Sequence, residues 1–321
     1  MALDTVNPEQ INRVGIVGAG LMGHSIALEF AAAGYDVSLH SRTQTSLDRA
    51  LAEIRLGLDK LVQFDLLSPE CREKAPERIR ATTVLERAVE GADLVVESVF
   101  EDVELKRQIF ERLDRACPEH TILASNTSSL MPSAFTPDTE RAARTLVSHY
   151  INPPYLIPLV EIVPTARTSS ETVDTVTAVL TRMGKRPIVV RKEVPGFILN
   201  RLQGALIREA LWMVESGIAT PQDVDISIKG SLGRRWAVAG IFEIFDIAGW
   251  DVVEAISSAV MPHLTNASET SPVLKKKVAD GELGAKSGKG FYEWSPETTA
   301  AMRQRIARAL VEIEKWESDQ E

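Results

Sequence analysis

The chain has 321 residues, a length typical of two domains, with 44% hydrophobic and 25% charged residues. Its 45 acidic and 36 basic side chains give a formal net charge of −9, which excludes the basic surface typical of proteins that bind nucleic acid or anionic membranes. No apolar run reaches the roughly 20 residues that span a bilayer, and no secretory signal begins the chain. Two cysteines provide neither a disulfide framework nor a metal site. We therefore expect a cytoplasmic protein without nucleic-acid, membrane or metal partners.

The first part of the chain alternates short β-branched segments with longer amphipathic ones. The expected strands are 13–17, 36–40, 79–83, 94–97, 121–124, 145–148, 159–163 and 187–190. The expected helices are 21–33, 46–65, 68–75, 103–116 and 170–183. Strands that alternate with helices predict βαβ units. The fold class is therefore α/β, with a Rossmann-like, doubly wound and mainly parallel sheet covered on both faces.

The pattern changes after Val194-Pro195-Gly196. Residues 197–217 predict one long amphipathic helix, and Thr220-Pro-Gln-Asp223 has the residues of a capped helix start. Residues 297–321 predict a charged helix. Few strand signals remain, so we expect an α/β domain over residues 1–195 and a smaller, all-helical domain over residues 196–321.

A glycine-rich segment joins the first expected strand to the first expected helix, and reads Gly18-Ala-Gly20-Leu21-Met22-Gly23. In this setting Gly18 permits a tight turn, Gly20 lets the backbone approach a pyrophosphate, and Gly23 lets the helix pack on the strand. The free N–H groups at the helix start would hold the anion. The segment, with Leu21 and Met22, therefore predicts a dinucleotide site; the alternative is a glycine-rich turn without a ligand.

The end of the second strand normally distinguishes NAD from NADP, because an acid there binds the ribose 2′-hydroxyl. This chain has Ser41 and Arg42 at that point, whereas Asp36 begins the strand and Asp48 lies inside the next helix. Ser41 leaves room for a 2′-phosphate and Arg42 can pair with it, which favours NADP. The alternatives are that Arg42 is solvated, or stacks on adenine while NAD binds. The expected cofactor is NAD or NADP.

Further motifs follow in order: Ala124-Ser-Asn-Thr-Ser-Ser-Leu130, His149-Tyr-Ile-Asn-Pro-Pro154, Leu159-Val-Glu161, Pro195-Gly-Phe-Ile-Leu-Asn-Arg201 and Lys286-Ser-Gly-Lys-Gly-Phe-Tyr292. Together with the glycine segment they resemble the 3-hydroxyacyl-CoA dehydrogenase family over about residues 12–294. The resemblance implies that His149 is the catalytic histidine, that Glu161 is its carboxylate partner, and that Ser128 and Asn200 hold the substrate oxygen. It also implies that the cofactor site is lined by three further residues, Glu101, Lys106 and Asn126. A homodimer formed through the helical domain is implied as well.

The residues support this chemistry independently. Oxidation of a secondary alcohol needs a group that accepts a proton near neutral pH, which His149 can do. Glu161 stands in an apolar segment, where an isolated carboxylate is costly and needs a partner. Ser128 and Asn200 can donate hydrogen bonds to a developing alkoxide. The alternatives are that His149 only ends a strand, that Ser128 caps a helix and that Asn200 is a structural amide.

The substrate prediction rests on two departures from the acyl-CoA members. Gln63-Phe64-Asp65 stands where further lysines for the CoA phosphates are expected after Lys60. Arg234-Arg235, with Tyr155, is similar to the branch that includes L-gulonate dehydrogenase, lambda-crystallin and carnitine dehydrogenase, which implies a small free carboxylate held by Arg235.

We therefore expect a dehydrogenase that reversibly oxidises the 3-hydroxyl group of a small hydroxy carboxylate. One alternative is a 3-hydroxyacyl-CoA dehydrogenase acting on a CoA thioester, with the Arg234-Arg235 pair solvated. An alternative of another class is a non-catalytic, nucleotide-binding structural protein.

Overall fold

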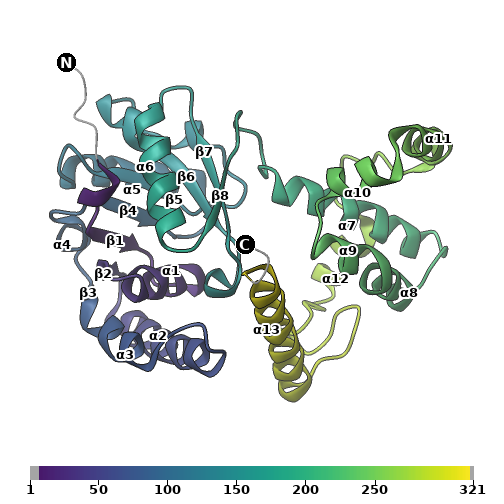
Figure 1. The fold of residues 1–321 in the computed structure, drawn as a ribbon, viewed down its shortest axis with the longest axis horizontal. Helices are drawn as coiled ribbons and strands as arrows, with labels where there is room; N and C mark the ends of the chain where they lie inside the picture. Colours follow the sequence, from purple (N-terminus) through teal and green to yellow (C-terminus); the bar gives the residue numbers. More distant parts are fainter. Residues whose placement is uncertain (1–6, 319–321) are drawn as a thin grey trace. The chain divides into compact units, whose positions relative to one another are not determined.

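The computed structural model describes residues 7–318, and the chain divides into two compact units, Met1–Arg201 and Leu202–Glu321. The first unit contains one eight-stranded sheet with the strand order β3-β2-β1-β4-β5-β6-β7-β8 (Figure 1). The strands are β1 (Arg13–Val17), β2 (Asp36–His40), β3 (Ile79–Thr82), β4 (Leu94–Glu97), β5 (Ile122–Ser125), β6 (Thr145–Tyr150), β7 (Leu159–Pro164) and β8 (Arg186–Val189). Neighbouring strands are parallel except β6 and β7, which are antiparallel. The predicted α/β class with a mainly parallel sheet is confirmed.

The helices of this unit follow the predicted order. They are α1 (Leu21–Ala32), α2 (Gln44–Gln63), α3 (Pro69–Lys74), α4 (Leu85–Val89), α5 (Val103–Ala116) and α6 (Ser170–Arg182). Helices α2, α5 and α6 begin after N-cap residues whose side chains accept a hydrogen bond from a backbone N–H of the first turn. These residues are Thr43, Asp102 and Ser169. Helix α4 was not predicted, because it has only five residues and no capping side chain.

One face of the sheet packs against α4 and α5. Alternate residues of the central strands, such as Val95, Leu123 and Val147, point to this face and are fully buried. They form one core cluster with residues of the two helices, including Phe110. The same alternation places the strand-end residues Glu97, Ser125, His149 and Glu161 on this face, toward the end of the sheet where the parallel strands finish. These polar side chains therefore lie on the same face of the sheet as the apolar core, at the ends of the strands.

The second unit is helical. Helix α7 (Leu199–Glu215) begins in the first unit and continues into the second. The further helices are α8 (Pro221–Ser227), a π-helical segment Ile228–Leu232, α9 (Gly233–Trp236), α10 (Ile241–Ala248), α11 (Trp250–Val260), α12 (Pro272–Ala279) and α13 (Pro296–Ser318). The capped start at Thr220 is confirmed, because Thr220 and Asp223 form a reciprocal capping box. The last residues of the helix predicted over 297–321, residues 319–321, lie outside the described part of the chain.

The helical unit buries few apolar side chains within the single chain. Helices α7 to α12 contain no buried residue, and Val311 is the one buried hydrophobic residue among the side chains described from 202 to 316. Large apolar side chains are exposed instead, among them Phe242 and Ile247 of α10. None of the helices within residues 7–318 has both the length and the apolar character needed to cross a membrane.

Candidate active site

The glycine segment forms the turn between β1 and α1. Gly18 has a φ of +109°, and a Cβ atom there would lie 2.3 Å from the carbonyl oxygen of Ser98. A Cβ atom at Gly23 would lie 1.8 Å from the carbonyl oxygen of Gly18, so both positions require glycine. Gly20 is different, because its Cβ would meet no protein atom within 4 Å. The backbone at Gly20 therefore borders open space at the start of α1, which is where a pyrophosphate would bind.

The open space at Gly20 fits a dinucleotide in two further respects. Gly20 is the N-cap of α1 and supplies no capping side chain, so the first N–H groups of the helix remain available. Leu21 is 64% exposed and Met22 is half-buried, so both predicted residues are accessible beside the turn.

The end of β2 carries no acidic side chain. Asp36 begins the strand and pairs with Arg78 at 3.4 Å, whereas Asp48 lies in α2 and accepts a hydrogen bond from Gln44. Ser41 is half-buried and Arg42 is exposed, directly before the cap of α2.

His149 and Glu161 form a buried hydrogen-bonded pair. The two residues are register partners in β6 and β7, and His149 Nδ1 lies 2.8 Å from Glu161 Oε2. His149 is 5% exposed and Glu161 is 0% exposed. The second carboxylate oxygen, Oε1, accepts the backbone N–H groups of Ile198 at 2.9 Å and Leu199 at 3.0 Å. The predicted partnership between the two side chains is therefore present in the fold.

These contacts decide the charge state and the tautomer. Burial raises the pKa of Glu161, but hydrogen bonds from His149 and from the amides of Leu199 and Ile198 outweigh burial, so the pKa lies below its ordinary value. An ionised carboxylate only accepts hydrogen bonds, so Nδ1 of His149 must be the donor. The neutral imidazole then carries its lone pair on Nε2, which is the atom a general base uses.

A left-handed turn delivers the two amides to Glu161. Gly196 and Phe197 have φ values of +78° and +51°, after which α7 begins at Leu199. The predicted helix start at residue 197 is wrong, because a residue in the left-handed region cannot be the first residue of a right-handed helix. The Phe197 side chain is fully buried, with its ring centroid 5.6 Å from that of His149. Sequence reasoning missed this role, although it placed the change in pattern directly after Val194-Pro195-Gly196.

Ser128 and Asn200 are in contact. Asn200 Nδ2 donates to the backbone oxygen of Ser128 at 2.7 Å, across 72 positions of sequence. Asn126, two residues before Ser128, accepts the N–H of Tyr150 at 2.9 Å, next to His149. The alternative that Ser128 caps an α-helix is wrong, because the next helical segment is the 3₁₀ turn Pro132–Ala134. Hydrogen bonds and short chain segments thus link all four predicted catalytic residues in one circuit.

Glu101 holds the segment that contains Ser128. Its Oε1 accepts hydrogen bonds from Thr127 Oγ1 at 2.6 Å, from the backbone N–H of Ser128 at 3.1 Å and from Ser129 Oγ at 2.9 Å. Burial raises the pKa of Glu101, but hydrogen bonds from Thr127 and Ser129 and the positive charge of Lys106 outweigh burial and lower the pKa.

Lys106 is almost completely buried and lies 3.8 Å from Glu101. Its side chain is 1% exposed, and its ammonium group is bonded to Glu97, which is 0% exposed. Sequence reasoning missed Glu97. It is an acid at the end of an apolar strand, the same signal that identified Glu161.

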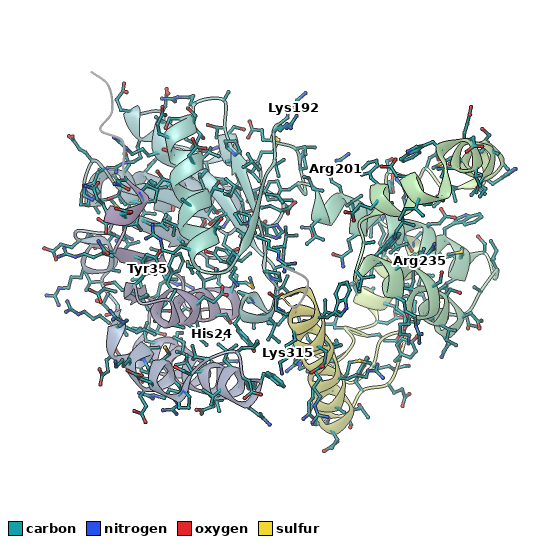
Figure 2. All side chains as sticks on the ribbon, viewed as in Figure 1. His24, Tyr35, Lys192, Arg201, Arg235 and Lys315 are labelled. Atoms are coloured by element: carbon teal, nitrogen blue, oxygen red, sulfur yellow. The ribbon has the colours of Figure 1, made fainter. Side chains whose placement is uncertain are left out.

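The two predicted substrate residues belong to different units. Tyr155 lies in the turn Pro154–Leu156 of the first unit and is half-buried; burial and the charge of Glu53 raise its pKa. The carbonyl oxygen of Pro154 accepts a hydrogen bond from Lys185 Nζ at 2.7 Å. Arg235 is exposed on α9 of the helical unit and is labelled in Figure 2.

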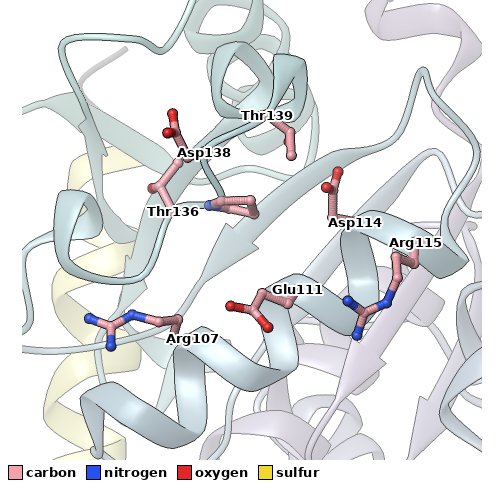
Figure 3. Close-up of a pocket in the computed structure, with 8 residues that line it drawn as sticks. Arg107, Glu111, Asp114, Arg115, Thr136, Asp138 and Thr139 are labelled. Atoms are coloured by element: carbon pink, nitrogen blue, oxygen red, sulfur yellow. The ribbon is translucent and has the colours of Figure 1, made fainter.

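A surface pocket in the first unit is separate from these residues. Figure 3 shows its lining, which consists of Arg107, Glu111, Asp114, Arg115, Thr136, Pro137, Asp138 and Thr139. Both acidic and basic side chains line it, and Arg107 is already paired with Glu104 at 2.8 Å. It includes none of the predicted site residues.

Two family models cover most of the chain. Residues 13–194 match the model "3-hydroxyacyl-CoA dehydrogenase, NAD binding domain", and residues 196–294 match "3-hydroxyacyl-CoA dehydrogenase, C-terminal domain".

Curated relatives match over long stretches. The 5-formyl-3-hydroxy-2-methylpyridine 4-carboxylate 5-dehydrogenase of Mesorhizobium japonicum is 31% identical over 95% of this chain and 98% of that one. A solved structure of a dehydrogenase of this name, an NAD+ dependent dismutase, has a TM-score of 0.88 with the same coverage and identity. The lambda-crystallin homolog of Homo sapiens is 42% identical over 72% of each chain. The L-carnitine dehydrogenase of Streptomyces griseus is 40% identical over 75% of this chain and 71% of that one.

The matches agree with the predicted family and branch, and they span both units. The chain therefore belongs to the 3-hydroxyacyl-CoA dehydrogenase family and is an NAD-dependent dehydrogenase that acts on CH–OH groups.

Proposed function

We propose that the protein reversibly oxidises the 3-hydroxyl group of a small hydroxy carboxylate to a ketone, with His149 as general acid and base. The observation that carries the proposal is the 2.8 Å hydrogen bond between His149 Nδ1 and Glu161. Because Nδ1 donates this bond, Nε2 is left as the proton acceptor. The glycine segment Gly18–Gly23 would hold NAD, whose chemistry there would be to take up a hydride from the hydroxyl-bearing carbon.

The proton balance follows from this pair. The alcohol O–H proton moves to Nε2 of His149, and the resulting imidazolium is stabilised by the buried carboxylate of Glu161. In the reverse direction the imidazolium returns the proton to the alkoxide. Glu161 keeps its orientation throughout, because two backbone amides hold its second oxygen.

Ser128 and Asn200 are proposed as the donors to the substrate oxygen. The amide of Asn200 has two hydrogens and uses one on the Ser128 backbone, which leaves the other free. The Ser128 hydroxyl is exposed and lies 3.4 Å from Glu101, a long contact that a substrate oxygen can replace. Each donor of this kind lowers the activation barrier by about 3 kcal/mol.

A free carboxylate is the proposed substrate class. Lys60 is the last basic residue of α2, and Gln63, Phe64 and Asp65 follow it with no further positive charge for the phosphates of CoA. Arg235 is proposed to bind the carboxylate through its two-pronged guanidinium group. The resemblance to the hydroxy-acid branch also supports Tyr155 of the first unit as a substrate residue. The names of the Mesorhizobium and Streptomyces relatives refer to small molecules and not to thioesters, which supports this choice.

Tolerance of NADP is a further proposal. The end of β2 carries no acidic side chain that would repel a 2′-phosphate. Arg42 is exposed there and has a planar guanidinium group that can bind the phosphate. The phosphate would also lie near the start of α2, a helix of 20 residues whose dipole favours negative charge at that end.

A homodimer is proposed because the helical unit buries few apolar side chains within one chain. A domain without a core of its own cannot offset the conformational entropy lost on folding, and α7 to α12 bury no residue within one chain. Two copies with a net charge of −9 each repel one another, so the attraction must come from apolar side chains such as Phe242 and Ile247. The resemblance to a family whose helical domain dimerises supports a second copy as the partner.

The decisive experiment compares initial rates of NAD and NADP reduction over a panel of 3-hydroxy acids and the matching 3-hydroxyacyl-CoA thioesters. We expect turnover of free acids, reduced on the order of 100-fold or more by His149→Asn. His120→Asn is the matched control, because His120 also lies against a carboxylate, Asp93, at 3.2 Å, at the opposite end of the sheet. Equal loss in both variants, or turnover confined to thioesters, would overturn the proposal.

A further inference from the structure

A buried ion pair lies beneath the segment that carries Ser128. Lys106 Nζ is 2.8 Å and 2.9 Å from the two carboxylate oxygens of Glu97, and the side chains are 1% and 0% exposed. The remaining acceptor sites of Glu97 are also used: Ser125 Oγ donates to Oε2 at 2.6 Å, and the N–H of Val99 donates to Oε1 at 2.6 Å. Every polar group of the pair therefore faces protein.

The placement of Lys106 is costly, which calls for a reason. It lies in the first turn of α5, where the helix dipole favours acids and opposes a positive charge. It is also removed from water, and a buried ion pair is often no more stabilising than an apolar replacement of the same volume. Stability alone does not account for a lysine at this position.

The same ammonium group faces a second carboxylate. Lys106 Nζ lies 3.8 Å from Glu101 Oε2, while the other oxygen of Glu101 collects the donors of Thr127, Ser128 and Ser129. Glu97 thus holds the ammonium group, which attracts one oxygen of Glu101 while the other oxygen faces the Thr127–Ser129 turn. Ser128 is connected to the core through this chain of contacts.

We propose that Glu97 and Lys106 are positioning residues that hold Glu101, and through it the Thr127–Ser129 turn, so that the Ser128 hydroxyl meets the substrate oxygen. Neither residue touches the substrate. The inference rests on the proposed role of Ser128 and extends it to two residues in the core. Lys106 then acts at the predicted cofactor site indirectly, through Glu101, in agreement with its burial.

The test uses Lys106→Met, Glu97→Gln and the double variant. Each single variant leaves one buried charge unpaired and is expected to lower the melting temperature, whereas the double variant removes both charges and regains much of it. We expect kcat to fall on the order of 10-fold to 100-fold in all three variants, with the KM for NAD changed little, because the turn shifts while the glycine segment does not. A merely structural pair would let kcat return together with stability in the double variant, and that result would overturn the proposal.

A second cycle tests the path through Ser128. In a Ser128→Ala background, Lys106→Met is expected to lower kcat by less than 3-fold, because the group it positions is already absent. If the losses in kcat caused by Ser128→Ala and Lys106→Met are fully additive, Lys106 does not act through Ser128.

A readout without substrate separates this inference from the proposed function. The N–H groups of Ser128 and Ser129 donate to Glu101, so their hydrogen exchange in the unliganded protein reports on the turn. Exchange there is expected to accelerate at least 10-fold in Lys106→Met, while the N–H groups of Ile198 and Leu199, held by Glu161, keep their protection. Lys185→Met, which breaks another buried lysine–carboxylate pair, that with Glu29, is the matched control and should leave the turn unchanged. Unchanged exchange at Ser128 and Ser129 in Lys106→Met overturns the inference even if the enzyme is active.

Discussion

Glu161 accepts the backbone N–H of Leu199, the first residue of α7, at 3.0 Å. One oxygen of this carboxylate contacts His149, and the other accepts a hydrogen bond from the start of α7. The contact joins β7 to a segment 38 residues later in the chain. It explains how a fully buried carboxylate stays ionised in an apolar sheet, because the donors that stabilise its charge are two backbone N–H groups and the imidazole of His149.

Replacement of Glu161 by Gln should disable proton transfer while the fold persists. The amide can present N–H to Nδ1 of His149, which shifts the imidazole proton to Nε2 and removes the proton acceptor. We expect kcat to fall on the order of 1000-fold, with the KM for NAD little changed. Steady-state kinetics with saturating NAD measure the effect. Activity within 10-fold of the unmodified protein would exclude Glu161 as the orienting group.

The same carboxylate should make stability depend on pH in a defined direction. Its pKa is lowered in the fold, so its contribution is complete above the ordinary carboxyl pKa and is lost as the pH falls through the lowered value. The difference in unfolding free energy between the unmodified protein and Glu161→Gln is therefore expected to shrink as the pH is lowered from 7 into the acid range. Urea unfolding at several pH values measures it. A difference that grows toward acid pH has the wrong sign.

The three glycines of the nucleotide turn should respond differently to alanine. Gly18→Ala and Gly23→Ala push a methyl group against backbone oxygens at 2.3 Å and 1.8 Å, so both should destabilise the fold by about 1–3 kcal/mol or more. Gly20→Ala meets open space and should leave the melting temperature within a degree or two, yet raise the KM for the dinucleotide. Thermal unfolding and cofactor titration separate the two classes. A large loss of stability in Gly20→Ala would show that this assignment is incorrect.

Cofactor choice should depend on Ser41 and Arg42. Arg42→Ala removes the proposed partner of a 2′-phosphate and should reduce kcat/KM for NADP by roughly 10-fold to 100-fold, the value of a charged hydrogen bond, with little change for NAD. Ser41→Asp places an acid at the end of β2 and should favour NAD over NADP in the same assay. Equal effects of Arg42→Ala on both cofactors would instead support stacking on adenine.

The helical unit should make stability depend on protein concentration. A dimer completed by a second copy has twice the chain mass of 35.3 kDa in sedimentation, and its melting temperature rises with concentration. Ile247→Arg, at a residue that is 88% exposed in the single chain, is expected to weaken a contact that covers α10. A monomer with a concentration-independent melting temperature rules out the second copy.

Local rules accounted for most of the α/β unit and for one helix start in the helical unit. The glycine turn, the strands and the capped start at Thr220 depend on residues close together in sequence, and their spacing is visible without a fold. The need of Glu161 for a partner was equally visible, because a carboxylate in an apolar strand must be satisfied. The helix start after Phe197 was misplaced, since its left-handed backbone is stabilised by burial against His149 and not by any local preference.

The sequence by itself determined which residues could do chemistry and in which elements they stand. Only the tertiary structure decided how they meet: Asn200 with Ser128 across 72 positions, and Lys106 enclosed by Glu97 and Glu101 beneath the same turn. The physical reason is that a residue's neighbours in sequence set its backbone, whereas strand register and helix packing set which polar groups become buried together. Once buried, those groups must satisfy one another, and their roles follow from that requirement.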